Sequence, residues 1–132
     1  MIQLSRCGAW QRTFPGTPAS VGEARRWLAE LLEGLPAADA ILVLSELASN
    51  TLRHTASRER GFAVAVEVRL RTVRLEVTDH GGPAAPALVE ADIDDETGRG
   101  LHIVEALTTR WGVNGERNGA RCVWAELPHK PE

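Results

Sequence analysis

Two consecutive stretches of alternating apolar and polar residues limit the folds open to this chain more than any other feature. The apolar side chains recur at every second position, at Phe62, Val64, Val66, Val68 and Leu70 and again at Val73, Leu75 and Val77. A period of two puts alternate side chains on opposite faces, so each stretch is predicted to be a half-buried strand. Only Arg71 and Thr72 separate the two stretches, and a connection this short predicts a β-hairpin.

Helical periodicity explains much of the chain before this hairpin. Ser20 followed by Glu23 matches a capping box, and apolar residues then recur at helical spacing to about Glu33. A second helix is predicted over Ala37–Thr55, and a short third one at about Gly100–Thr109. The other strands are predicted within Met1–Phe14, at Trp111–Asn114 and at Arg121–Leu127. This order of elements predicts an α+β fold, with a mixed, mostly antiparallel sheet and helices on one face.

Composition limits the functions that such a fold can serve. The chain has 132 residues, which predicts one domain over 1–132. Eighteen acidic residues against fifteen Lys and Arg give a net charge of −3, which argues against direct binding of nucleic acid because that requires a basic surface. No apolar run approaches the roughly 18 residues of a membrane span. The two cysteines are too far apart in sequence for a common metal motif, and we expect a cytoplasmic protein.

Three polar residues share one edge of the second predicted helix. Glu46, Asn50 and His54 are spaced four residues apart, so each is rotated by only about 40° from the previous one. One interpretation is an ordinary solvent-exposed face, and the other is a chemical site containing a carboxylate, an amide and an imidazole. Glu46 is unusual for a solvent-exposed face, because its neighbours are apolar rather than charged.

Two glycine-containing motifs follow later in the chain. Asp79-His80-Gly81-Gly82 ends the second strand of the hairpin, and it predicts either a turn or a carboxylate that accepts a hydrogen bond from a ligand. In the second case the glycines let the ligand approach the backbone closely. Gly98-Arg99-Gly100-Leu101 opens the third predicted helix. Its free N–H groups suit a phosphate, although a plain helix start explains the motif equally well.

The order and spacing of these motifs are more specific than any one of them. The segments ELASNTLRH, DHGG and GRGLHIV resemble the N box and the two glycine boxes of the GHKL family of ATP-binding domains. The resemblance covers about Arg12–Leu127. Two further segments are similar to those of the actinobacterial anti-sigma-factor serine kinases related to SpoIIAB and RsbW. They are Phe14-Pro15-Gly16 and Arg110-Trp111-Gly112. The resemblance implies the two-layer α/β sandwich of that family, the Bergerat fold.

The resemblance also implies a role for each residue of these motifs. Asn50 would be a ligand of Mg²⁺ on the phosphates of ATP, and Glu46 would orient or deprotonate an attacking serine hydroxyl. Asp79 would accept a hydrogen bond from the adenine amino group, and Gly81 would give the base room. The phosphates would be held by the second glycine box, which comprises Gly98, Arg99, Gly100 and Leu101. The segment Pro83–Thr97 would be the lid.

The function implied by the resemblance is that of a kinase and a transcriptional regulator. Such a protein sequesters a sigma factor and phosphorylates a serine on an anti-anti-sigma protein of the STAS type, and the resemblance allows for a homodimer. The alternative is an ATP-binding regulatory protein without kinase activity, a nucleotide-gated binding module. Relatives often carry Lys-Thr where this chain has Arg121-Cys122. Cys122 is therefore expected either to weaken a nucleotide contact or to be an ordinary buried cysteine of the strand.

Overall fold

The computed structural model describes residues 7–54, 61–79, 102–115 and 120–128. Its labelled elements are β1 (Gly8–Phe14), α1 (Pro18–Leu31), α2 (Ala38–His54), β2 (Phe62–Val68), β3 (Thr72–Asp79), β4 (Arg110–Gly115) and β5 (Arg121–Pro128). Residues 102–107 are also helical, within the range predicted for the third helix. The order of strands and helices is therefore the one predicted from the sequence.

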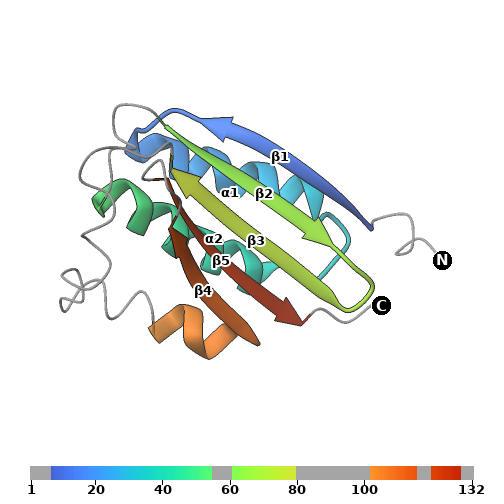
Figure 1. The fold of residues 1–132 in the computed structure, drawn as a ribbon. Helices are drawn as coiled ribbons and strands as arrows, with labels where there is room; N and C mark the ends of the chain where they lie inside the picture. The colour runs from blue at the N-terminus through green and yellow to red at the C-terminus, as the bar shows by residue number, and fades with distance from the viewer. Residues whose placement is uncertain (1–6, 55–60, 80–101, 116–119, 129–132) are drawn as a thin grey trace.

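The strands form one five-stranded sheet in the order β1-β2-β3-β5-β4 (Figure 1). All four pairings between the described strands are antiparallel, so the sheet expected to be mixed is antiparallel throughout the part described. β2 and β3 form the predicted hairpin, and the backbone N–H of Arg69 donates to the carbonyl oxygen of Thr72 at 2.8 Å across the turn. This hairpin occupies the middle of the sheet.

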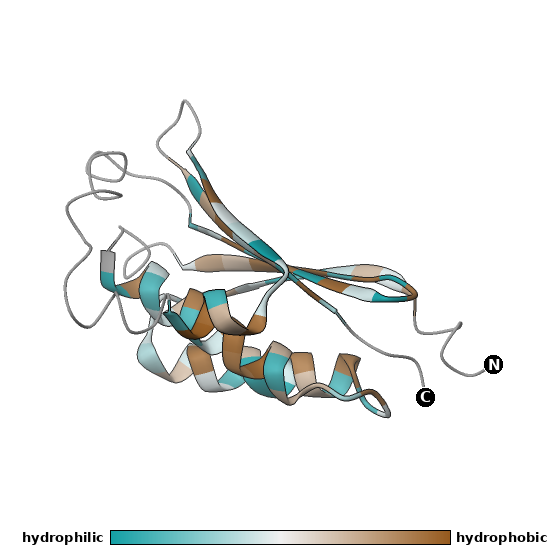
Figure 2. Ribbon diagram, turned by 90° about the horizontal axis from the view of Figure 1, so that it is seen from below, coloured by the Kyte–Doolittle hydropathy of each residue, from teal (hydrophilic) through white to brown (hydrophobic). Residues whose placement is uncertain are grey.

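Helices α1 and α2 cover one face of the sheet, which makes the molecule a two-layer α/β sandwich (Figure 2). Burial alternates along β2, β3 and β5, because every second side chain points toward the helices. The ring of Phe14 stacks on that of Phe62 with 5.6 Å between centroids, and Trp27 of α1 meets Phe14 edge to face at 5.8 Å. The core thus joins the first two strands to the first helix.

Helix α1 begins earlier than the sequence pattern indicated. Its N-cap is Thr17, and Pro18 lies in the first turn, where the missing N–H of proline leaves no helical hydrogen bond unmade. Ser20 is buried inside the helix, and its hydroxyl oxygen lies 3.1 Å from the hydroxyl oxygen of Thr17. The predicted capping box from Ser20 to Glu23 is therefore wrong, because proline and not serine defines the start of the helix.

Helix α2 matches its prediction to within a residue at each end. It runs over Ala38–His54, and the buried residues on its sheet-facing side include Leu44, Leu47 and Ala48. None of the helices within the described ranges combines the length and the apolar character needed to cross a membrane.

Candidate nucleotide site

Three elements bring polar residues to the same end of the molecule. The C-terminal end of α2, the C-terminal end of β3 and the N-terminal end of β5 lie together at the left of Figure 1. Because β3 and β5 run antiparallel, the last residue of β3 lies beside the first residue of β5. Helix α2 packs on both strands, so Asn50, Asp79 and Arg121 belong to one region of the fold.

Asp79 is a buried carboxylate at the last position of β3. Only 2% of the residue is exposed, and it lies on the helix-covered face, in register with Phe62 of β2. The backbone N–H of Arg121 donates to its Oδ1 at 3.0 Å. A carboxylate is expensive to bury unless hydrogen bonds compensate for the lost water, and this bond fixes the side chain against the start of β5.

Asn50 contributes a buried acceptor in the second half of α2. Its Oδ1 is inaccessible to solvent and accepts no hydrogen bond from the residues that the structure describes. An unsatisfied buried acceptor costs about 1–3 kcal/mol, which a bound cation or donor would recover. An amide oxygen is a hard ligand of the type that Mg²⁺ prefers. The chemistry of Asn50 therefore fits the predicted metal.

A magnesium ion held by Asn50 would also bind oxygens of the nucleotide phosphates. Within the described ranges, no group of three His, Cys, Asp or Glu side chains is placed to hold a metal ion. Mg²⁺ usually keeps several waters and binds to one or two protein oxygens together with substrate phosphates. A site in which Asn50 is one of the few protein ligands is compatible with this coordination.

Glu46 lies one turn before Asn50 on the same helix and is half-buried. It lines a groove of about 460 Å³ between the two helices, together with Arg25 of α1 and with Leu42 and Ser45 of α2. Leu42 is 42% exposed, which is high for a leucine in this protein. The Glu46 side chain is therefore open to the outer surface of the helical layer, whereas the Asn50 oxygen is closed off from solvent.

Several predicted binding residues lie outside the described part of the chain. These are Gly81, Gly98, Arg99, Gly100 and Leu101, together with the predicted lid Pro83–Thr97. Their roles stay predictions. The residues that can be placed in space are Glu46, Asn50 and Asp79.

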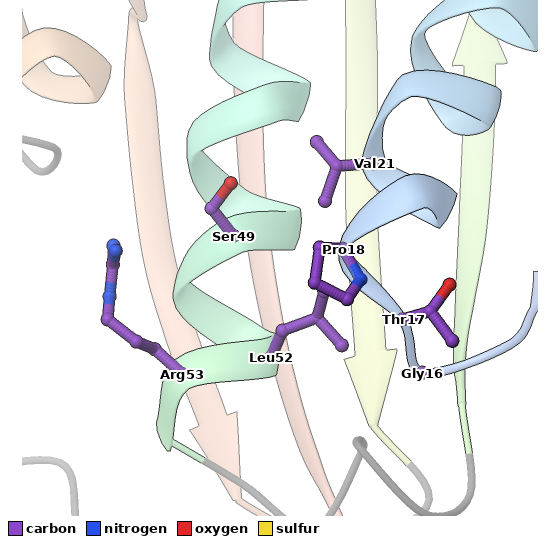
Figure 3. A pocket seen from close by; sticks show the side chains of 7 residues that line it. All are labelled: Gly16, Thr17, Pro18, Val21, Ser49, Leu52 and Arg53. Atoms are coloured by element: carbon purple, nitrogen blue, oxygen red, sulfur yellow. The ribbon is translucent and has the colours of Figure 1, made fainter.

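A larger cavity lies between the start of α1 and the end of α2 (Figure 3). It measures about 630 Å³ and is lined by Gly16, Thr17, Pro18, Val21, Ser49, Leu52 and Arg53. Leu52 points across it toward Pro18. Glu46, Asn50 and Asp79, the predicted site residues that the structure describes, do not line this cavity, so its volume alone does not identify the nucleotide site.

Arg121 is a buried residue of this region that was not among the predicted site residues. The neighbouring Cys122 was the residue of β5 expected to affect the site or to be buried. Cys122 is only half-buried, and it occupies one of the positions of β5 that face away from the helices. The prediction of a buried cysteine is therefore wrong. Arg121 shares the helix-covered face with Val123, leaves only 6% of its surface exposed, and contacts Asp79 through its backbone. The alternation of residues along β5 indicates that Arg121 occupies a buried position.

Comparisons with known proteins agree with this architecture. The family model for the histidine kinase-like ATPase domain matches residues 14–126. An uncharacterized protein of Streptomyces coelicolor is 36% identical over 89 residues, which cover 61% of this chain and 83% of that protein.

Two solved structures have the same fold. The histidine kinase AdeS of Acinetobacter baumannii matches with a TM-score of 0.52 and 14% identity, over 98% of this chain and 73% of that one. The histidine kinase domain of a blue-light activated histidine kinase from Erythrobacter litoralis matches with a TM-score of 0.50 and 17% identity, over 96% and 68% of the two chains. At such low identities the likeness establishes the fold alone.

Proposed function

The chain belongs to the histidine kinase-like ATPase domain family, and we propose that it is an anti-sigma factor with ATP-dependent protein serine kinase activity. Membership of the family makes it an ATP-binding domain. The further assignment is supported by the Phe14-Pro15-Gly16 and Arg110-Trp111-Gly112 segments, which are similar to those of anti-sigma-factor serine kinases.

The observation that carries the nucleotide part of the proposal is the buried Oδ1 of Asn50, which accepts no hydrogen bond from the described residues. Asn50 would hold Mg²⁺, which when bound neutralises charge on the ATP phosphates. Asp79, fixed by the backbone of Arg121, would accept a hydrogen bond from the adenine amino group. A site that hydrogen-bonds the exocyclic amine of adenine discriminates against a base lacking that amine.

Glu46 is the residue that distinguishes a kinase from a binding module. A general base must reach the hydroxyl proton of the incoming serine, and Glu46 borders a groove open to the outer surface of the helical layer. In transfer, the serine oxygen would form a bond to the γ-phosphorus while the bond between the γ-phosphorus and the β-γ bridging oxygen breaks. Glu46 would take the hydroxyl proton and ADP would leave. A module that only binds ATP does not need a carboxylate at this position.

The proposed partners are a sigma factor and an anti-anti-sigma protein of the STAS type, with a homodimer as the proposed assembly. The basis for proposing these partners is the family resemblance. The net charge of −3 supports an action through proteins rather than through direct binding of DNA, because DNA binding relies on cationic surfaces.

The test compares Glu46→Ala with Asn50→Ala, using Glu30→Ala, an exposed acid of α1, as the control. ATP affinity is measured by calorimetry, and transfer is measured as phosphate incorporated into the anti-anti-sigma protein of the same genome. Glu46→Ala should keep near-normal ATP affinity while transfer falls by about 10²-fold or more, the usual size of a general-base contribution. Asn50→Ala should lose both, and Glu30→Ala neither.

Two outcomes would change the proposal. Transfer at the wild-type rate by Glu46→Ala would remove Glu46 as the base. A wild-type protein that binds ATP but phosphorylates no partner of its own genome would be a nucleotide-gated binding module, the second candidate.

A further inference from the structure

Arg121 is a buried cation at the position directly opposite Asp79. Thr78 pairs with Cys122, so the next position of the two antiparallel strands places Asp79 across from Arg121. Their side chains share the helix-covered face, with 2% and 6% of the two residues exposed. Side chains at directly opposite positions of an antiparallel pair have Cβ atoms about 4.5–5.5 Å apart. A ligand that reaches the Asp79 carboxylate therefore also comes within reach of the Arg121 guanidinium.

The two groups offer complementary hydrogen bonding. An ionised aspartate only accepts hydrogen bonds, and a guanidinium only donates them. The amino group of adenine is flanked by ring nitrogens that accept, so an acceptor beside a donor matches that edge of the base. Asn and Gln read adenine through the same pairing when they bind its amino group and N7 together.

We propose that Arg121 is a second base-reading residue of the nucleotide site, donating to the adenine ring nitrogen beside the amino group bound by Asp79. This inference rests on the proposed function, because it assumes that Asp79 meets adenine. In this proposal the backbone and the side chain of Arg121 have different roles. The backbone N–H of Arg121 positions the carboxylate at 3.0 Å, and its side chain contacts the base.

The experiment pairs side-chain variants with ATP analogues. Arg121→Ala and Arg121→Gln both keep the backbone N–H and hence the bond to Asp79. Arg71→Ala, at an exposed arginine in the β2–β3 turn, is the matched control. Calorimetry with Mg²⁺ measures the affinity of each protein for ATP, 1-deaza-ATP and 7-deaza-ATP, and urea unfolding measures the stability of each variant.

Arg121→Ala should weaken ATP binding about tenfold, the size of a charge-assisted hydrogen bond. The analogue that lacks the contacted nitrogen should bind the wild type more weakly by a similar factor and lose little further in the variant. Arg121→Gln keeps a neutral donor, so its affinity for ATP should lie between those of the wild type and Arg121→Ala. If Arg121→Ala does not fold, Arg121→Gln replaces it in the comparison. Arg71→Ala should bind all three nucleotides as the wild type does.

Two results would overturn the inference while leaving the proposed function intact. One is an Arg121 variant that binds ATP as well as the wild type does. The other is an equal loss for ATP and both analogues, which would mean that the side chain acts only on the structure of the site. Failure of the wild type to bind ATP would overturn the proposed function, and this inference with it.

Discussion

Glu126 joins two arginines from different strands on the sheet face that the helices do not cover. Its Oε1 accepts a hydrogen bond from Nη2 of Arg110 at 2.9 Å, and its Oε2 accepts one from Nη1 of Arg74 at 2.8 Å. The hydrogen bond from Arg110, reinforced by that from Arg74, lowers the pKa of the Glu126 carboxyl below its ordinary value, although partial burial opposes the shift. Arg74 also lies over the ring of Trp124, 4.4 Å from its centroid.

The lowered pKa of Glu126 predicts a loss of stability in acid. A carboxyl with a lower pKa in the folded state contributes stability that is complete above its unfolded pKa and is lost as the pH falls through its folded pKa. The wild-type free energy of unfolding should therefore decline more steeply between roughly pH 5 and pH 3 than that of Glu126→Gln. Urea unfolding across this range measures the difference, with Glu105→Gln, an exposed acid, as the control. Parallel curves for wild type and Glu126→Gln would contradict the prediction.

At the scale of single residues, the sequence supplied candidate residues for the site but not the contacts that those residues make. Asn50 and Asp79 could be selected because an amide on a helix edge and a carboxylate at a strand end belong to recognisable local patterns. The alternation of β5 indicates that Arg121 is buried, but it does not reveal the bond to Asp79, because that bond joins residues 42 positions apart and depends on the pairing of β3 with β5. Pairing between distant strands is a tertiary property that local periodicity does not specify.

Among the elements, the entry into β2 depends on one glycine. Gly61 has a φ of 84°, a conformation that is unfavourable for residues with a Cβ. A Cβ at this position would also collide with the backbone carbonyl oxygen of Phe14, and backbone cannot move aside as a flexible side chain can. The ladder between β1 and β2 starts here, where Phe14 pairs with Phe62.

Gly61→Ala should therefore lower the free energy of unfolding by about 2 kcal/mol or more, through backbone strain and the clash with β1. The matched control is Gly115→Ala at the end of β4, where an added Cβ would meet no atom of the described residues within 4 Å. Its effect should stay within about 0.5 kcal/mol. Chemical denaturation of both variants measures the contrast, and equal effects would show that Gly61 is not special.

The elements themselves were predictable wherever one face of a strand or helix is buried. β2 and β3 alternate without interruption, so burial fixes their register and the hairpin follows from the pattern. The start of α1 was not predictable from capping residues alone, because Ser20 and Pro18 are competing start signals two positions apart. Thr17 and Pro18 define the start, and Ser20 is buried within the helix.

At the scale of the whole molecule, the proposed site residues extend from the interior of the sandwich to the surface of the helical layer. The Oδ1 of Asn50 is inaccessible to solvent, and Asp79 is buried on the helix-covered face of β3. Glu46 borders a groove on the outer side of the helices. All three depend on α2 and on the sheet that it covers, so a ligand held by Asn50 and Asp79 should stabilise the molecule as a unit.

Nucleotide binding should consequently raise the unfolding temperature, and removing the metal should reverse part of the gain. A ligand that binds only the folded state at one hundred times its Kd adds about 2.7 kcal/mol, which for a domain of this size is on the order of 10 °C. Mg-ATP should produce this shift in the wild type, and EDTA should reduce it. GTP should give much less, because guanine carries an oxygen in place of the 6-amino group that Asp79 is proposed to bind. Asp79→Asn should lose most of the shift, whereas Asp39→Asn, at an exposed acid in the first turn of α2, should keep it. Scanning calorimetry at fixed nucleotide concentration measures all of these shifts. Equal shifts with ATP and GTP in the wild type, or an undiminished shift in Asp79→Asn, would show that Asp79 does not read the base.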